Sequence, residues 1–206
     1  MERIDIPKKA IYRLSIYHRC LQRLVEHGEE TVSSSALAKV AGVKPAQLRK
    51  DLAYFGQFGT RGLGYPVAAL ASMIRDVLGR EHLQPVVLVG AGNLGSALLR
   101  YPGFQKEGFE VIAAFDADPE AALARGVEVP VFPESELERH IVEREVRMAI
   151  LCVPARVAQA VANRAVAAGV TGILNFSPVR LELPEDVMVN NVDLALELEH
   201  LSFFVR

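Results

Sequence analysis

The sequence has few of the features that mark a secreted, membrane-bound or metal-dependent protein. Its only two cysteines, Cys20 and Cys152, fall in different predicted domains and lie at no metal-ligand spacing. It has no uncharged apolar run of about 18 residues, the length that crosses a bilayer. Residues 2–9 carry several charges, so we expect no apolar segment of a secretory leader there. We therefore predict a globular cytoplasmic protein with no metal ion and no membrane partner.

The small net charge of −2 conceals an uneven distribution along the chain. Residues 1–80 hold 13 Lys and Arg against 7 Asp and Glu, a balance of +6, and residues 81–206 hold 10 against 18, a balance of −8. A basic unit joined to an acidic one indicates that the first contacts a polyanion and that the second has another task. We place a domain boundary at residue 80.

The basic part has the pattern of a helix-turn-helix. Apolar residues recur at helical spacing over residues 7–27, which predicts a first amphipathic helix. The serines at 33–35 can cap a helix over 36–41, and Gly42 ends it. A further helix over 45–55 begins with a proline in its first turn. Two short helices separated by about four residues around a glycine are typical of the helix-turn-helix motif.

The helix over 45–55 has one apolar side and one polar side. Its apolar side, which includes Leu48 and Leu52, is expected to pack inward. Its outer side carries residue types that contact base edges and phosphates. Residues 57–65 are glycine-rich and predict a hairpin wing. A merely solvated helix face is the alternative, but the wing favours a winged helix that binds DNA. The candidate DNA contacts are Lys44, Gln47, Lys50 and Tyr54, with Arg49 at the margin and Arg61 near the tip of the wing.

The acidic part is organised around residues 86–95, an apolar run that breaks into glycines and resumes as a helix. Gly90 would allow a sharp turn, Gly92 the approach of a pyrophosphate, and Gly95 close packing of helix and strand. Asp116 ends the next apolar run, 21 residues past Gly95, where a carboxylate binds ribose hydroxyls and repels a 2′-phosphate. A structural glycine turn is the alternative. The candidate contacts of NAD(H) are Gly90, Ala91, Gly92, Asn93, Leu94, Gly95 and Asp116.

Apolar runs alternate with helical segments through the rest of this part. The pattern predicts an α/β fold with a Rossmann-like doubly wound parallel sheet, whose ligands bind at the carboxyl ends of the strands. Two further strand ends would then form the walls around a nicotinamide, unless their prolines merely end the strands. These candidates are Val153, Pro154, Asn175, Phe176, Ser177 and Pro178.

The last segment, residues 193–205, is apolar on several sides of a helix and must be buried. A partner subunit is the predicted burial site, which implies a twofold homodimer with an inserted or swapped helix. A core helix of the same chain is the alternative. The predicted domains are a winged-helix DNA-binding domain at 1–80, a Rossmann NAD(H)-binding domain at 81–190 and a domain-swapped dimerisation helix at 191–206.

The sequence offers little of what a dehydrogenase needs beside its nicotinamide. It has no Tyr-x-x-x-Lys motif and no acid-flanked histidine loop. We therefore predict that the protein is not an enzyme and that the cofactor is a signal whose output is DNA binding. An NAD-dependent oxidoreductase with an appended DNA-binding domain is one alternative. A thiol sensor that acts through Cys152 is another, although no basic neighbour in sequence favours a thiolate.

Five stretches spread over the chain carry a family resemblance. They are LRKDLAYFG (48–56), VGAGNLG (89–95), AAFDADP (113–119), GILNFSP (172–178) and NVDL (191–194). Together they resemble the Rex family of redox-sensing transcriptional repressors over nearly the whole chain.

The resemblance implies a homodimer that binds a pseudo-palindromic double-stranded DNA operator when NADH is low and releases it when NADH binds. NAD⁺ would be a weaker competitor. It also implies that Tyr101 lies at the cofactor and belongs to an allosteric relay in which Asp193 pairs with Arg13 in one state and with Tyr101 in the other. Two positions depart from the family pattern: Ser15-Ile16 stands where Leu-Pro is expected, and Cys152 where threonine is expected.

Overall fold

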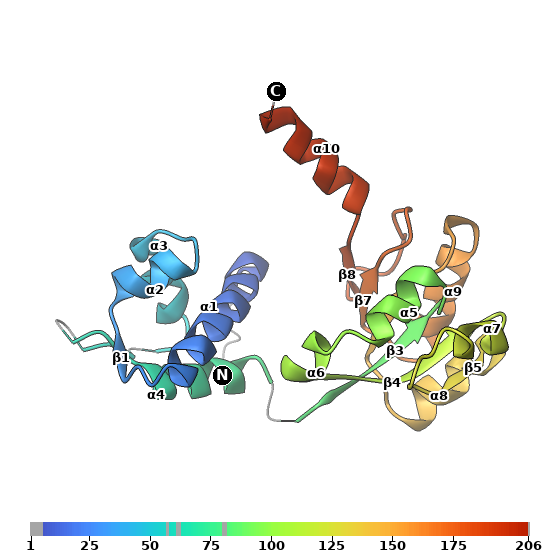
Figure 1. Cartoon of the computed structure of the whole chain (residues 1–206), viewed down its shortest axis with the longest axis horizontal. Helices are drawn as coiled ribbons and strands as arrows, with labels where there is room; N and C mark the ends of the chain where they lie inside the picture. Colours follow the sequence, from blue (N-terminus) through green and yellow to red (C-terminus); the bar gives the residue numbers. More distant parts are fainter. Residues whose placement is uncertain (1–5, 57, 61–62, 80–81, 206) are drawn as a thin grey trace. The chain divides into compact units, whose positions relative to one another are not determined.

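The computed structural model describes residues 6–56, 58–60, 63–79 and 82–205. The chain divides into two compact units, Met1–His82 (unit 1) and Leu83–Arg206 (unit 2), which are described separately (Figure 1). Within the described ranges, no helix is long and apolar enough to cross a membrane.

Unit 1 is a small helical domain with a two-stranded sheet. Its core joins all four helices and includes Leu14, Leu21, Leu37, Leu48 and Ile74. The element order is α1 (Lys8–Glu26), β1 (Thr31–Val32), α2 (Ser34–Val40), α3 (Pro45–Ala53), β2 (Tyr65–Pro66) and α4 (Val67–Val77).

Local signals in the sequence explain the helix-turn-helix formed by α2 and α3. The Ser33 hydroxyl caps α2 by accepting a hydrogen bond from the Ala36 amide at 3.0 Å. Gly42 follows the helix with φ +68°, a conformation that residues with a side chain rarely adopt. Pro45 occupies the first turn of α3. The predicted motif is therefore confirmed, with α3 in the place of the recognition helix.

The base of the predicted wing is also present. β1 and β2 pair antiparallel, and Thr60 and Gly64 form an antiparallel bridge at the base of the hairpin. Gly64 has φ +85°, and a Cβ there would collide with the carbonyl oxygen of Val32, so only glycine fits. Arg61, the predicted contact at the tip, lies outside the described residues.

Unit 2 contains a six-stranded sheet in the order β5-β4-β3-β6-β7-β8, in which every pair of neighbours is parallel. This is the Rossmann strand order, and the order reverses between β3 and β6. The strands are β3 (Gln84–Val89), β4 (Phe109–Asp116), β5 (Val131–Pro133), β6 (Met148–Leu151), β7 (Gly172–Asn175) and β8 (Met188–Asn191).

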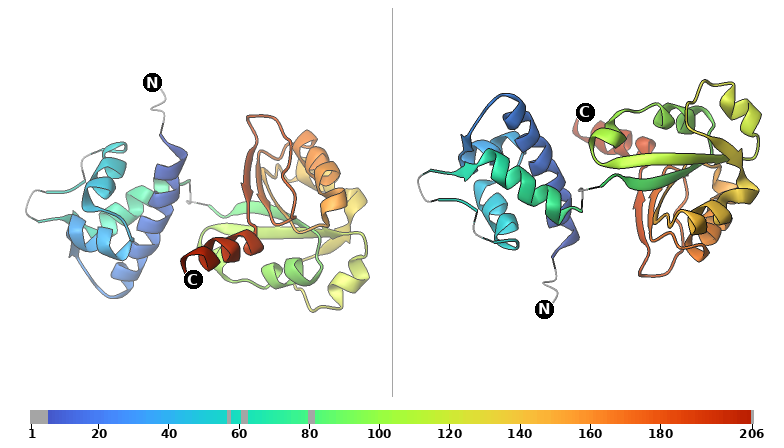
Figure 2. Two further views of the ribbon diagram at one scale, coloured as in Figure 1. Left: turned by 90° about the horizontal axis from the view of Figure 1, so that it is seen from above. Right: turned by 90° about the horizontal axis from the view of Figure 1, so that it is seen from below.

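Helices cover both faces of the sheet (Figure 2). Side chains of β3 alternate between the faces: Val86 and Leu88 pack with α5, α6 and α7, whereas Val87 and Val89 pack with α8 and α9. The doubly wound fold predicted from the alternating pattern is therefore confirmed. The helices are α5 (Asn93–Leu99), α6 (Gly103–Lys106), α7 (Pro119–Leu123), α8 (Leu137–Glu143) after a short 3₁₀ turn (Glu134–Glu136), and α9 (Ala155–Ala167).

One strand departs from the pattern expected from sequence. β8 was not expected at all, because its sequence Met-Val-Asn-Asn has no apolar run and its side chains are half-buried or exposed. It forms by pairing in register with β7, which a sequence pattern does not reveal.

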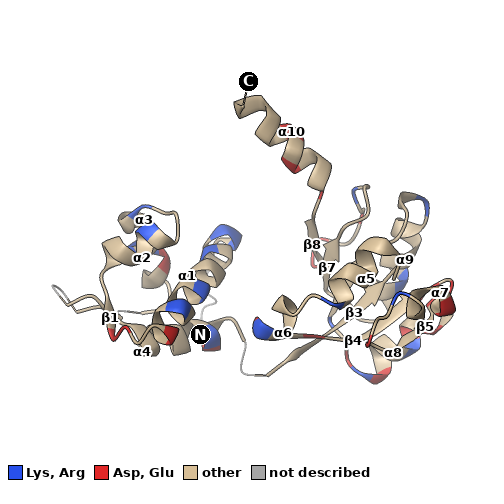
Figure 3. Cartoon of the chain, in the orientation of Figure 1, with Lys and Arg blue, Asp and Glu red and all other residues tan. Residues whose placement is uncertain are grey.

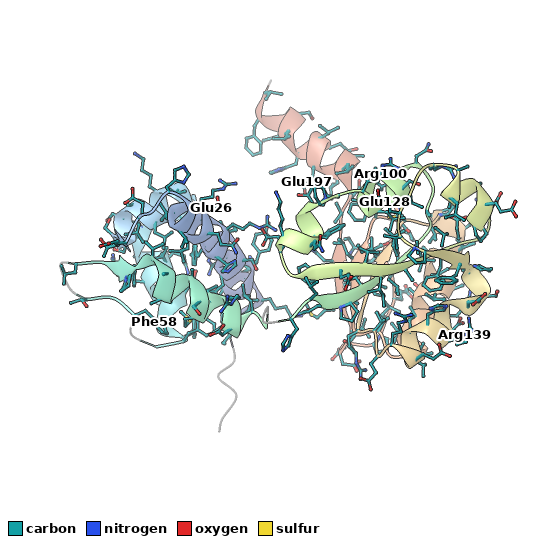
Figure 4. All side chains as sticks on the ribbon, turned by 60° about the horizontal axis from the view of Figure 1, so that its bottom comes forward. Glu26, Phe58, Arg100, Glu128, Arg139 and Glu197 are labelled. Atoms are coloured by element: carbon teal, nitrogen blue, oxygen red, sulfur yellow. The ribbon has the colours of Figure 1, made fainter. Side chains whose placement is uncertain are left out.

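The last helix, α10 (Leu194–Phe204), has no buried residue along its fully described length. Leu198 is 68% exposed and Phe203 is 72% exposed. The alternative of a core helix of the same chain is therefore wrong for this structure. Figure 4 draws the side chains of α10, among them the labelled Glu197, on a ribbon that leads away from the sheet.

Candidate dinucleotide site and nucleic-acid interface

The glycine turn after β3 lies where the strand order reverses. Gly90 has φ +93°, and a Cβ there would lie 2.7 Å from the backbone carbonyl carbon and oxygen of Cys152 on the neighbouring strand end. A Cβ on Gly95 would collide with the carbonyl oxygen of Gly90. Gly92, in contrast, has open space around the position of a Cβ. Gly90 and Gly95 thus have the sharp turn and the close helix packing predicted for them, and the backbone at Gly92 has open space beside it.

Asp116 at the end of β4 is held against this turn. Its carboxylate accepts hydrogen bonds from the backbone amides of Ala91, at 2.7 Å, and Asp118, at 2.9 Å. A carboxylate fixed in this way stays beside the turn, where its negative charge would repel a 2′-phosphate. Ala91 itself is buried, and Asn93 and Leu94 beyond it are exposed.

Ser96 is a residue of the turn that the sequence analysis missed. Its hydroxyl is buried and lies 2.6 Å from the carbonyl oxygen of Ala91 and 2.7 Å from that of Gly92. It ties the first turn of α5 to the glycine loop. A serine that follows the third glycine directly was the available signal.

At the end of β6, Cys152 is half-buried, Val153 is buried and Pro154 is exposed as the residue before α9. Burial raises the pKa of the Cys152 thiol to about 12, so it is a neutral thiol near pH 7. This protonation state gives no support to the thiol-sensor alternative.

The loop after β7 uses two of its predicted site residues for its own structure. Asn175 is fully buried, and its amide donates to the carbonyl oxygens of Ser177 and Val179 and to the side chain of Asn191. The buried Ser177 hydroxyl donates to the carbonyl oxygen of Val153 at 2.7 Å. Neither side chain points its polar atoms outward. Phe176, half-buried, and Pro178, exposed, are the members of this group that retain surface for a ligand.

Two predicted relay residues lie in unit 2. Tyr101 is 57% exposed, and its ring packs edge-to-face on Phe104 with 5.2 Å between ring centroids. The ring also lies over Gly103, where any Cβ would collide with it. The Asp193 carboxylate caps α10 by accepting hydrogen bonds from the amides of Ala195 and Leu196, at 3.0 and 3.1 Å.

The third relay residue, Arg13 of α1, forms a bidentate ion pair with Asp51 of α3. Its Nε and Nη2 lie 2.6 and 2.7 Å from the two carboxylate oxygens. Asp51 is only 1% exposed and also accepts hydrogen bonds from the Tyr17 hydroxyl and the Gln47 amide, both at 2.8 Å. Asp51 therefore joins the first helix to the recognition helix. Asp51 is not among the site residues predicted from the sequence, although an acid inside the apolar face of a helix was a usable signal.

The charges of this cluster shift one another's titration. Burial alone would raise the pKa of Asp51, but hydrogen bonds from Arg13, Tyr17 and Gln47 outweigh it and hold the pKa below its usual value. The hydrogen bond between Arg13 and Asp51 also raises the pKa of Arg13. Burial, followed by the hydrogen bond to Asp51, raises the pKa of Tyr17. The cluster is charged as an Arg–Asp pair at neutral pH.

The outer face of α3 differs from the expected one at two positions. Lys44 and Lys50 are exposed, as predicted. Arg49, predicted at the margin, is also exposed and donates a hydrogen bond to the Ser34 hydroxyl at 3.2 Å. Gln47 and Tyr54 are half-buried, although both were predicted to point outward. The amide of Gln47 is held by Asp51, since the two residues are one helical turn apart. Figure 3 shows Lys and Arg along both α1 and α3.

Known families and relatives match both units of the chain. Residues 81–179 match the family described as "CoA binding domain", and residues 5–53 match the family described as "Putative DNA-binding protein N-terminus". The chain is 48% identical to the redox-sensing transcriptional repressor Rex of Desulforamulus reducens, over 98% of this chain and 97% of that protein. It is also 48% identical to the Rex of Streptomyces coelicolor, over 96% of this chain and 77% of that protein.

This chain belongs to the Rex family. Solved Rex-family structures share its fold over nearly the full length. The crystal structure of RSP in complex with β-NAD⁺ and operator DNA matches with a TM-score of 0.90 and 35% identity, over 98% of this chain and 94% of that one. RSP in complex with β-NADH matches with a TM-score of 0.84 and 33% identity, over 98% of this chain and 95% of that one. The matched proteins named as Rex are regulators of transcription.

Proposed function

We propose that this Rex-family chain is a transcriptional repressor that senses the ratio of NADH to NAD⁺. As a homodimer it binds a pseudo-palindromic operator when NADH is low, and it leaves the operator when NADH binds unit 2. NAD⁺ competes weakly for the same site. The complexes of RSP with β-NAD⁺ and operator DNA, and with β-NADH, support this assignment. Because its target is chromosomal DNA, we propose the cytoplasm as its location.

The observation that carries the proposal is the geometry of the glycine turn and Asp116. The backbone at Gly92 is open to a pyrophosphate, and the Asp116 carboxylate stands 2.7 Å from the amide of Ala91 at the same edge of the sheet. This arrangement fits an NAD(H) whose ribose hydroxyls bind Asp116. An apolar nicotinamide pocket near Phe176 and Val153 would favour uncharged NADH over the cationic ring of NAD⁺.

The DNA contacts in this proposal come from α3 and the wing. Lys44, Arg49 and Lys50 are exposed on α3 and supply cations for phosphates and guanine edges. Arg61 would add a contact from the wing. The amide of Gln47 donates to Asp51 within α3. Asp51 in turn holds α3 against α1 through Arg13 and Tyr17, which positions the cationic side chains.

α10 is the proposed dimerisation element. We propose the same three functional segments as before: the DNA-binding domain at 1–80, the NAD(H)-binding domain at 81–190 and the dimerisation helix at 191–206. Leu194, Leu196, Leu201 and Phe204 are all more than half exposed, on several sides of the helix. An isolated apolar helix of this kind is stable in water only when a second surface covers it. A second copy of the chain supplies that surface in a twofold dimer.

The relay of Arg13, Asp193 and Tyr101 remains part of the proposal. Arginine has five N–H donors, and Asp51 takes two of them through Nε and Nη2. Arg13 can therefore bind a second carboxylate without releasing Asp51. A Tyr101→Phe protein that binds NADH normally should respond weakly on DNA, and a normal response would exclude the relay.

The test is a selection of binding sites by the full-length protein from random DNA duplexes, at one fixed salt concentration. We expect a twofold-symmetric site to be selected and NADH to release it at much lower concentration than NAD⁺. Lys50→Ala should weaken operator binding at unchanged NADH affinity. Arg75→Ala makes an equal charge change at an exposed position of α4, which lies across unit 1 from α3 (Figure 1), and serves as the matched control. Selection of no sequence, or equal effects of both nucleotides, would overturn the proposal.

The same titration addresses the oxidoreductase alternative. NADH absorbance should stay constant while the operator is released, because binding alone shifts the equilibrium. Consumption of NADH in step with release would favour an enzyme.

A further inference from the structure

The side chain of Asn175 connects the loop after β7 with the start of α10. Asn175 is 0% exposed at the carboxyl end of β7. Its Nδ2 lies 3.2 Å from the carbonyl oxygen of Ser177, 2.9 Å from that of Val179, and 2.9 Å from Oδ1 of Asn191. A single buried amide thus contacts three points on two separate segments.

The Asn191 end of this connection leads directly into α10. Asn191 is the last residue of β8 and pairs in register with Asn175. The next backbone amide, that of Val192, donates to the carbonyl oxygen of Asn175 at 2.8 Å. The residue after that, Asp193, caps α10 through two backbone amides. The segment that leads into α10 is therefore held to β7 by one backbone and one side-chain hydrogen bond.

The number of acceptors makes this connection sensitive to the loop. The amide group of asparagine has two hydrogens, and three acceptors lie within reach of the Asn175 nitrogen. The two loop carbonyls and Asn191 therefore compete for two hydrogens. If the loop moved both carbonyls closer to Asn175, the hydrogen bond to Asn191 would weaken, and if the loop moved away, that hydrogen bond would strengthen. The position of the loop would then set how firmly the start of α10 is held.

We propose that Asn175 and Asn191 are positioning residues that transmit occupancy of the cofactor crevice to α10. This inference rests on the proposed function, because it requires that a ligand displace the loop at 176–179. The loop carries Phe176 and Pro178, the residues of this strand end with surface for a ligand. Ligand binding repartitions the hydrogens of Asn175, and α10 changes its attachment.

The test measures coupling rather than stability. Coupling is the ratio of the operator Kd at saturating NADH to the operator Kd without nucleotide. Asn191→Ala removes one acceptor at an exposed position, so the protein should fold. Loss of one hydrogen bond changes an equilibrium by roughly three- to tenfold, and we expect coupling to fall by that factor. The NADH Kd of the DNA-free protein should change by less than about twofold.

Two further variants separate this role from a structural one. Asn191→Asp retains an acceptor oxygen and should preserve the coupling of the wild type. Asn190→Ala and Asn190→Asp make the same changes on the opposite face of β8 and serve as controls. Unchanged coupling in Asn191→Ala, with or without a lower Tm, would overturn the inference. If NADH still releases the wild-type protein from the operator, the proposed function is unaffected by that result. Failure of the wild type to respond to NADH would overturn both.

Discussion

Replacement of Asp51 by asparagine should destabilise unit 1 because it removes the anion from a buried cluster of donors. The carboxylate accepts two hydrogen bonds from Arg13 and one each from Tyr17 and Gln47. In Asp51→Asn one carboxylate oxygen becomes an NH₂ group that faces other donors. The guanidinium of Arg13 then has no anionic partner at this site.

The expected magnitude follows from the burial of the two partners. Removal of one partner from a buried ion pair costs about 3–5 kcal/mol. The side chain of Asp51 is 1% exposed, but that of Arg13 is 22% exposed, so water can solvate part of the orphaned charge. We therefore expect the lower end, a loss of about 3 kcal/mol in the unfolding free energy of unit 1.

The assay is urea unfolding of the full chain followed by circular dichroism at pH 7 and at lower pH. Glu26→Gln makes the same chemical change at the exposed end of α1 (Figure 4) and should alter stability by less than about 0.5 kcal/mol. The pKa of Asp51 is lower in the folded state than in the unfolded state. Its stabilisation is therefore present at neutral pH and declines as pH falls below about 4 toward the folded pKa.

Two results would refute this reasoning. One is an unfolding midpoint for Asp51→Asn at pH 7 equal to that of Glu26→Gln. The other is a stability difference between Asp51→Asn and the wild type that does not shrink in acid. Operator affinity should fall together with stability, because Asp51 also positions α3 against α1.

Two further predictions concern unit 2. Burial raises the pKa of Cys152 to about 12, so iodoacetamide at pH 8 should label this thiol much more slowly in the folded protein than in urea, and Cys152→Ser should keep its response to NADH. Equal labelling rates by mass spectrometry would contradict the assigned burial. His140 packs its ring 4.3 Å from that of Phe132 and 5.3 Å from that of Phe115, and its buried Nε2 has no hydrogen-bond partner among the described residues. His140→Phe should therefore raise the unfolding free energy by about 1 kcal/mol in thermal or urea unfolding, and a lower stability would mean that this nitrogen is satisfied.

Much of the fold could be predicted because its signals are local. The capping serine before α2, the glycine after it and the proline in α3 each act within about four residues. The glycine turn after β3 is likewise encoded within a few neighbouring residues, and its geometry agrees with the turn predicted at Gly90 and the close packing predicted at Gly95. Strand β8 escaped prediction because an exposed edge strand lacks an apolar run and depends on its partner β7.

The sequence by itself determined the two-part division of charge, the helix-turn-helix, the doubly wound parallel fold and the position of the acid that faces the glycine turn. Only the tertiary structure decided which polar side chains form hydrogen bonds and ion pairs within the protein. Arg13 and Asp51 are 38 residues apart, and Asn175 and Asn191 are 16 apart. Such pairs form because buried donors and acceptors must find partners wherever the packed backbone brings them together. A pattern of neighbouring residues therefore identifies a helix or a turn, whereas the partners of a buried charge or amide emerge only when distant segments pack.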